Sequence, residues 1–161
     1  MKKIIIFSVL LFATLHLKAQ EKTFWNKLKG EELETSVTIL PFGTHYTALQ
    51  FNEVYYVGFN YKSFELARFT NSFGEPSLTA LYKRKIAFTE NFSMQYGFGF
   101  MYGYHGKLQD VETIPFRNSF LFTGQINPLG GINLDYKLAK KLSFNLAITP
   151  VVAIYGLRYI L

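Results

Sequence analysis

Residues Phe92–Tyr104 read FSMQYGFGFMYGY, and none of these thirteen residues is charged. Successive side chains of a strand point to opposite faces, so this stretch predicts one large, mostly aromatic wall and one small or polar wall. A soluble sheet would show charge on its open face, whereas a membrane barrel has large apolar groups toward lipid and small groups toward its lumen. Because a bilayer tolerates only helices or closed barrels, one such strand implies several more. The large set is Phe92, Met94, Tyr96, Phe98, Phe100, Tyr102 and Tyr104, and the small set is Ser93, Gln95, Gly97, Gly99, Met101 and Gly103.

The first twenty residues have the features of a secretory signal peptide. Lys2 and Lys3 precede an apolar run that is too short to cross a bilayer as a helix, and Ala19 suits cleavage. We therefore expect Met1–Gln20 to be removed, with a retained N-terminal anchor as the alternative. About 141 residues then remain, enough for one eight-stranded barrel. Export and aromatic-rich composition together predict the bacterial outer membrane.

The composition of the chain narrows the classes of function. There is no cysteine, which excludes disulfides, thiol nucleophiles and cysteine metal sites. The formal net charge of +6 falls to about +3 once Lys2, Lys3 and Lys18 leave with the signal peptide. This surplus suits contact with anionic lipid head groups and is too small to indicate nucleic-acid binding.

Residues Glu21–Glu34 are expected to form an amphipathic helix that lies in a membrane interface. Phe24, Trp25 and Leu28 fall at helical spacing among lysines, a composition typical of interfacial helices. A frayed, solvated leader is the alternative, and Gly30 would weaken or end the helix.

Residues Thr35–Leu161 are expected to form the barrel. The predicted fold class is therefore all-β, an eight-stranded antiparallel transmembrane β-barrel preceded by the N-terminal amphipathic interfacial helix. Tight connections are expected at Tyr61–Lys62, Thr89–Asn91 and Asn127–Pro128, in alternation with longer polar ones, as in bacterial barrels. The eight stretches of strand character are Thr35–Leu49, Val54–Tyr61, Ser63–Asn71, Ser77–Phe88, Phe92–Tyr104, Thr113–Gln125, Leu129–Leu138 and Leu142–Leu161.

This topology predicts which residues share one rim of the barrel. With the N-terminus on the inner side of the membrane, the outer ends of strands one, three, five and seven lie together. That rim would hold three pairs of residues: His45 and Tyr46, Asn71 and Ser72, and Tyr104 and His105. It would bring His45 and Ser72 to the same side of the membrane, although they are far apart in sequence. His105, in a loop between glycines, is interpreted as an ordinary surface residue.

His45 and Ser72 are candidates for acyl-transfer chemistry, with Glu75, Asp110 or Glu112 as an acidic partner. A serine hydroxyl becomes a good nucleophile only when a nearby base takes its proton, and histidine suits that role. The alternative is that His45 is a hydrogen-bonded surface side chain.

Two prolines interrupt predicted strands. Pro41 and Pro150 each remove a hydrogen bond from the sheet and indicate a bulge or a lateral opening through which a lipid could pass. Gly97, Gly99 and Gly130–Gly131 are interpreted as strand glycines that make room in the lumen. The sequence has no phosphate-binding loop, dinucleotide-binding motif or metal-ligand cluster.

Taken together, these residues resemble the lipid A palmitoyltransferase (PagP) family, small outer-membrane barrels that move an acyl chain from a phospholipid to lipid A. The family has an interfacial helix before strand one, to which Glu21–Glu34 is similar. The first strand of the family has a proline that is followed a few residues later by the catalytic histidine, and Pro41–His45 resembles this arrangement. The family also has an Asp-Ser pair that is followed by Glu-Pro. Asn71-Ser72 followed by Glu75-Pro76 is similar, although this stretch is two residues shorter in the present chain. Glu90–Phe100 and Ile148–Pro150 resemble the family's fifth and last strands.

The resemblance implies a catalytic site at His45, Asn71 and Ser72. Asn71 stands where the family has an aspartate, so it can orient a neighbour but cannot accept a proton. An acyl-chain pocket is implied at Leu81, Gly97 and Gly99. Leu81 falls near the glycine that limits chain length in the family, so any pocket is predicted to be shorter than one built for palmitate.

The leading hypothesis is an outer-membrane acyltransferase that works as a monomer, with a phospholipid donor and a lipid A or lipopolysaccharide acceptor. No metal or cofactor is required, and nucleic acid is not an expected partner. A non-enzymatic small barrel for adhesion, envelope integrity or permeation is the alternative from another class. Hydrolysis of the same lipids, with water as acceptor, is a third possibility.

Overall fold

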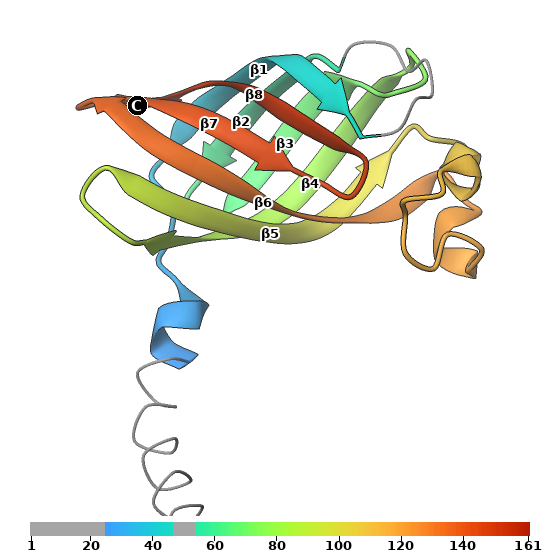
Figure 1. The fold of residues 1–161 in the computed structure, drawn as a ribbon, viewed down its shortest axis with the longest axis horizontal. Helices are drawn as coiled ribbons and strands as arrows, with labels where there is room; N and C mark the ends of the chain where they lie inside the picture. The colour runs from blue at the N-terminus through green and yellow to red at the C-terminus, as the bar shows by residue number, and fades with distance from the viewer. Residues whose placement is uncertain (1–24, 47–53) are drawn as a thin grey trace, which may run out of the picture. The chain divides into compact units, whose positions relative to one another are not determined.

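The computed structural model describes residues 25–46 and 54–161, and within them eight strands form a closed antiparallel barrel (Figure 1). Each strand pairs with its neighbour in sequence, and β1 pairs with β8 to close the sheet. The eight-stranded antiparallel barrel expected from the sequence is thereby confirmed. The strands are β1 Ser36–His45, β2 Tyr56–Tyr61, β3 Phe64–Thr70, β4 Pro76–Ala87, β5 Phe92–Tyr102, β6 Ile126–Ala139, β7 Leu142–Ile148 and β8 Val152–Ile160.

The two ends of the barrel differ in their connections. Residues 62–63, 88–91 and 140–141 make short turns at one end, here called the turn end. The chain leaves β1, β3, β5 and β7 at the other end, here called the loop end, on the right in Figure 1. Residues 103–125 connect β5 to β6 there and contain two 3-10 turns, η1 (Lys107–Asp110) and η2 (Phe120–Phe122).

Strand β5 has the two walls that its sequence predicts. Phe98, Phe100 and Tyr102 point outward and are 59%, 62% and 43% exposed, whereas Gln95 and Met101 are buried inside the barrel. Each of the remaining seven strands also exposes large apolar side chains on the outside of the barrel. Examples are Phe59, Leu66, Leu78, Ile132, Phe144 and Leu157.

The predicted sixth strand, Thr113–Gln125, was wrong. These residues belong to the β5–β6 connection, and strand β6 begins only at Ile126. The segment cannot stay extended because Phe116 has a left-handed backbone (φ 57°) and because Ile114 and Phe122 turn inward together. The turn expected at Asn127–Pro128 was also wrong, since both residues lie within β6.

The predicted last strand, Leu142–Leu161, is in fact two strands. Strand β7 ends at Ile148, residues 149–151 turn the chain, and β8 follows. Pro150 therefore lies in a turn and not within a strand. The Thr149 hydroxyl holds this turn by accepting hydrogen bonds from the Val151 and Val152 amides at 3.3 and 3.1 Å. The strand count stayed at eight because this extra strand replaces the one lost before Ile126.

The N-terminal segment is helical over a shorter range than predicted. Residues 25–29 form a helix, and Gly30 follows with φ 60°. Glu31 instead pairs with Lys85 in an isolated antiparallel bridge, so the helix does not reach Glu34. The signal peptide and residues 21–24 lie outside the described residues. Over 25–46 and 54–161, no helix has the length and hydropathy needed to cross a bilayer.

Charged and amide side chains fill the turn half of the lumen. Arg158, only 3% exposed, donates a hydrogen bond to the Glu34 carboxylate at 3.0 Å and lies 3.5 Å from the Asp135 carboxylate. Asp135 also accepts hydrogen bonds from Asn145 at 3.1 Å and Gln95 at 3.3 Å. Buried polar groups are tolerated when they satisfy one another in this way. This half of the lumen is therefore closed by a connected polar network.

Candidate functional site

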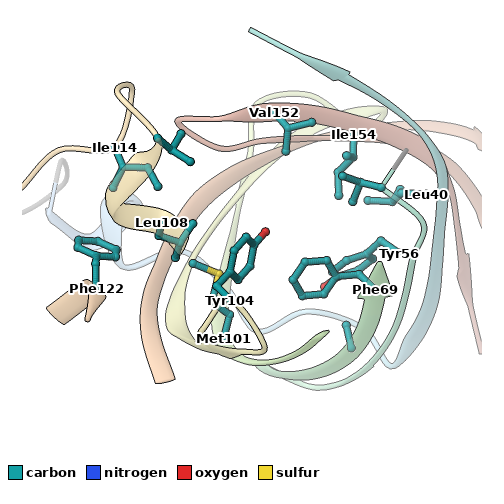
Figure 2. Close-up of a cluster of buried hydrophobic side chains, with 13 residues drawn as sticks. Leu40, Tyr56, Phe69, Met101, Tyr104, Leu108, Ile114, Phe122, Val152 and Ile154 are labelled. Carbon is teal, nitrogen blue, oxygen red and sulfur yellow. The ribbon is translucent and has the colours of Figure 1, made fainter. Parts of the chain in front are cut away.

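A cavity of about 380 Å³ occupies the loop half of the lumen. Cavities of roughly 300–1,000 Å³ are the size that proteins use for small organic ligands. Most of its wall is apolar, and Figure 2 shows the buried side chains that surround it. Those side chains are Leu40, Val54, Tyr56, Phe69, Met101, Tyr104, Val152 and Ile154 from the strands and their ends, with Leu108, Val111, Ile114 and Phe122 from residues 103–125.

A buried ion pair lies where the apolar cavity meets the polar half. The Lys83 ammonium is 3.0 and 3.1 Å from the two carboxylate oxygens of Glu65, and both residues line the cavity. The Tyr56 hydroxyl donates a further hydrogen bond to Glu65. Leu81 also lines the cavity and lies opposite Glu65 in the sheet register. This group forms the floor of the cavity.

The glycines predicted to line an acyl pocket differ in their surroundings. Gly97 lines the cavity, and a Cβ there would come within 2.9 Å of Lys83 Cγ. Gly99 is not among the lining residues. A Cβ on Gly99 would lie 2.1 Å from the Ala80 carbonyl oxygen, so this glycine allows β4 and β5 to approach closely.

A bulge at Pro41 keeps His45 on the inner face of β1. Between Ile39 and Phe42 the strand contains one more residue than β8 does between Leu157 and Tyr155. The extra residue shifts the alternation of faces, so Phe42 is exposed whereas His45 is half-buried. A strictly alternating strand would have turned His45 outward.

Gly156 of β8 accommodates this bulge. A Cβ at Gly156 would come within 2.2 Å of the Ile39 carbonyl oxygen and 2.8 Å of Pro41 Cδ. The sequence predicts a bulge or an opening at Pro41, and the structure has a bulge there.

Asn71 shapes the turn that carries Ser72. Its side-chain oxygen accepts hydrogen bonds from the amides of Phe73 (2.9 Å) and Glu75 (3.0 Å). Its side-chain nitrogen donates to Ser77 Oγ and to the Gly103 carbonyl oxygen, each at 3.1 Å. Asn71 is fully buried. It therefore acts as a positioning residue that ties the β3–β4 turn to the end of β5.

The structure brings His45 and Ser72 together at the loop end of the barrel. His45 Nε2 lies 2.8 Å from Ser72 Oγ, within hydrogen-bond distance, although the residues are 27 positions apart. Ser72 is buried and lines the cavity. A histidine at this distance can take the serine proton, the arrangement that activates a serine nucleophile.

Tyr104 also lies beside Ser72. The topology predicted Tyr104 on the same rim, but nothing in the sequence indicated a role for it in the chemistry. The aromatic pattern of β5 predicted that it would point outward, but Gly103 has φ 118° and breaks the alternation. Tyr104 turns inward, is 8% exposed, and packs against Phe69 and Phe73 with ring centroids 6.2 and 6.0 Å away. Burial raises the pKa of Tyr104 to about 12, and hydrogen bonding with Ser72 only partly opposes this shift. Its hydroxyl therefore stays protonated and can donate a hydrogen bond.

The candidate acids lie elsewhere on the loop end. Glu75 pairs with Lys107, whose ammonium is 2.6 Å from its carboxylate, and this hydrogen bond is the main cause that lowers the pKa of Glu75. Asp110 and Glu112 are exposed, and His105 packs against the ring of Tyr102. The geometry thus favours a His45–Ser72–Tyr104 group over a site built on these carboxylates.

The cavity reaches the barrel wall between β6 and β7. Strand β6 pairs with β5 along its whole loop half, but with β7 only from Ile132 onward. Both sides of this gap line the cavity, residues 128–131 on one side and residues 149–152 on the other. Pro128 lacks an amide hydrogen and lies on this unpaired edge, where it leaves no donor unsatisfied.

No group of side chains in the described parts of the chain is arranged to hold a metal ion. Comparison of the chain with protein-family models, with curated proteins and with solved structures finds no match.

Proposed function

We propose that this protein is an outer-membrane acyltransferase that moves a fatty acyl chain from a phospholipid to lipid A or a related acceptor. The observation that carries the proposal is the contact between His45 Nε2 and Ser72 Oγ at 2.8 Å, beside an apolar cavity. An acyl chain needs such an apolar space, and its ester needs an activated hydroxyl group next to it.

The exposed outer wall supports a membrane location. Phe98, Phe100 and Leu66 are each 59% or more exposed, and similar side chains are found around the whole barrel. The largest apolar patch of a soluble monomer is commonly only about 300–600 Å². A continuous apolar exterior is expected of a barrel that faces lipid.

In this proposal the acyl chain lies in the cavity and the ester carbonyl lies beside Ser72. In one route His45 takes the Ser72 proton, Ser72 Oγ bonds to the carbonyl carbon, and the lysophospholipid oxygen leaves with the proton from His45. The acceptor hydroxyl then attacks the acyl-serine, His45 takes its proton, and Ser72 recovers one. In the other route His45 activates the acceptor hydroxyl directly, and Ser72 orients the ester. In both routes the Tyr104 hydroxyl donates a hydrogen bond to the oxyanion.

The gap between β6 and β7 supports access from the side. A phospholipid in the membrane can place one acyl chain through this gap without passing its head group through the lumen. The Lys83–Glu65 pair lies between the cavity and the polar network of the turn half. These polar groups would limit how far the acyl chain extends into the lumen.

An acyl-transfer assay tests the proposal. Refolded protein is mixed with lipid A and a phospholipid that carries a labelled acyl chain, and the products are separated by mass. We expect labelled lipid A from the wild type and a decrease of about 100-fold or more for His45→Ala, the usual effect of losing a general base. His105→Ala is the matched control, since His105 lies at the same end of the barrel but is exposed. Labelled free fatty acid without labelled lipid A would indicate the hydrolase instead.

The polar network of the turn half favours a second candidate, a non-enzymatic barrel that stabilises the envelope. The ion pairs of Arg158 with Asp135 and Glu34 close the lumen in this half. They argue against the passage of small molecules through the barrel but suit a rigid structural barrel. This candidate predicts no labelled product in the same assay and no effect of His45→Ala.

A further inference from the structure

The connection between β5 and β6 exposes large apolar side chains next to buried ones. Ile114 and Phe122 are buried in the cluster that walls the cavity. Phe116 and Phe120, between them in sequence, are 85% and 83% exposed, and Leu121 is 45% exposed. The loop therefore has an inner apolar face that meets the cavity and an outer apolar face with no contact that would bury it in the described chain.

The exposure of Phe116 is part of the ordered fold of this loop. Phe116 has φ 57°, a conformation that is costly for a bulky residue and that persists only where the surroundings hold it. The Ser119 amide donates to the Phe116 carbonyl oxygen at 2.9 Å, and the Phe122 amide donates to the Ser119 carbonyl oxygen at 3.2 Å. These bonds stabilise a turn in which both phenylalanine rings are exposed.

The exposed face continues the apolar outer wall of the barrel. Ile126, at the start of β6, is 65% exposed and pairs with Tyr102 on β5, and Phe100 follows on the same face. Between Thr113 and Leu134 the only charged residue is Arg117. Apolar rings beside a single cation match the boundary of a bilayer, where acyl chains meet anionic phosphates.

We propose that Phe116, Phe120 and Leu121 form a lipid anchor that inserts at the head-group boundary of the membrane. The inference rests on the membrane location given under the proposed function, but not on acyl transfer. Because the same loop contributes Leu108 and Ile114 to the cavity wall, the anchor holds one side of the cavity at the lipid surface.

Single-tryptophan fluorescence tests the anchor. Trp25 is the only tryptophan of the chain, so Trp25→Phe gives a background without one. In this background Phe116→Trp and Phe120→Trp report on the anchor. Phe100→Trp reports on the barrel wall, and Glu112→Trp reports on a charged, exposed position of the same loop. The refolded variants are placed in phosphatidylcholine and phosphatidylglycerol vesicles that contain a lipid with a nitroxide near its head group.

The anchor predicts blue-shifted emission and several-fold stronger nitroxide quenching for Phe116→Trp and Phe120→Trp than for Glu112→Trp. If Phe100→Trp is quenched while the two anchor positions behave like Glu112→Trp, the anchor is wrong although the barrel is in the membrane. If Phe100→Trp is not quenched either, both the anchor and the membrane location are wrong.

Discussion

Asn71 uses its whole side chain in the structure, since its oxygen accepts two hydrogen bonds and its nitrogen donates two. An aspartate would keep the two bonds from the amides of Phe73 and Glu75. It would lose the donor to the Gly103 carbonyl oxygen and place a negative charge against it. The asparagine thus fits its surroundings in this chain, and its role is to hold Ser72 beside His45.

Asn71→Asp should therefore destabilise the barrel and lower activity. A buried acceptor left without its donor costs about 1–3 kcal/mol. The measurement is the urea midpoint of the refolded barrel in vesicles, with Asn118→Asp at an exposed loop position as the control. An unchanged midpoint would show that the two hydrogen bonds donated by Asn71, to Ser77 and to Gly103, contribute nothing to stability.

Leu81 is the residue whose size should limit the length of the acyl chain. It lines the cavity beside the Lys83–Glu65 pair, where the apolar space ends. Leu81→Gly removes a side chain from this floor and should shift selectivity toward longer acyl donors. Competition between labelled donors of different length measures the shift. Unchanged selectivity would mean that other floor residues set the limit.

The bulge of β1 determines which residues of this strand face the lumen. The sequence pattern before Pro41 places Ser36, Thr38 and Leu40 inside. Past the bulge the inner positions become Gly43 and His45, in register with Ile154 and Val152 of β8. One extra residue is thus what keeps the candidate base on the inside of the barrel.

A nitroxide scan of β1 should reveal this change of phase. The chain has no native cysteine, so single cysteines at positions 39 to 45 can each carry the label. Accessibility to oxygen dissolved in lipid should be high at positions 39, 42 and 44 and low at 40, 43 and 45. Strand β8, with unbroken alternation, is the control. High values at 39, 41, 43 and 45 would mean that the bulge is absent.

The elements also show how far a sequence can predict this fold. The two walls of β5 could be predicted because the alternation of side chains along a strand is a local property. The approach of His45 to Ser72 could be predicted because the strand topology places both strand ends on one rim. The segment Thr113–Gln125 has the apolar content of a strand, but only Ile114 and Phe122 pack into the buried cluster, whereas Phe116 and Phe120 are exposed. Tyr104 was misplaced because the left-handed backbone of Gly103 cannot be deduced from alternation alone.

The lumen of the barrel divides into a polar half that closes the barrel and an apolar half that can receive a ligand. Glu34 connects the segment before β1 to the polar half. It pairs with Lys85 at 2.6 Å and with Arg158 at 3.0 Å, and thereby joins residues 31–35 to β4 and β8.

The Glu34 contacts predict a pH-dependent contribution to stability. Burial raises the pKa of Glu34, but hydrogen bonds from Lys85 and Arg158 outweigh it and lower the pKa from 4.5 to about 2. Because the folded-state pKa is the lower one, the stabilisation is complete above pH 4.5 and is lost as the pH falls toward 2.

Glu34→Gln should therefore lower the urea midpoint at pH 7, and the difference from the wild type should shrink as the pH approaches 2. The exposed neighbour Glu32 provides the control Glu32→Gln. An equal difference at both pH values would contradict the assignment of this contribution to the Glu34 carboxylate.

The proposed acyltransferase activity is best tested by the mass of lipid A from bacterial cells that express this chain. Cells with the wild type, His45→Ala or His105→Ala are compared after the barrel is shown to be folded in the outer membrane. An acyltransferase that depends on His45 should give an added acyl mass with the wild type and with His105→Ala, and none with His45→Ala. Lipid A of unchanged mass in all three would contradict this proposal, as would an added mass that persists without His45.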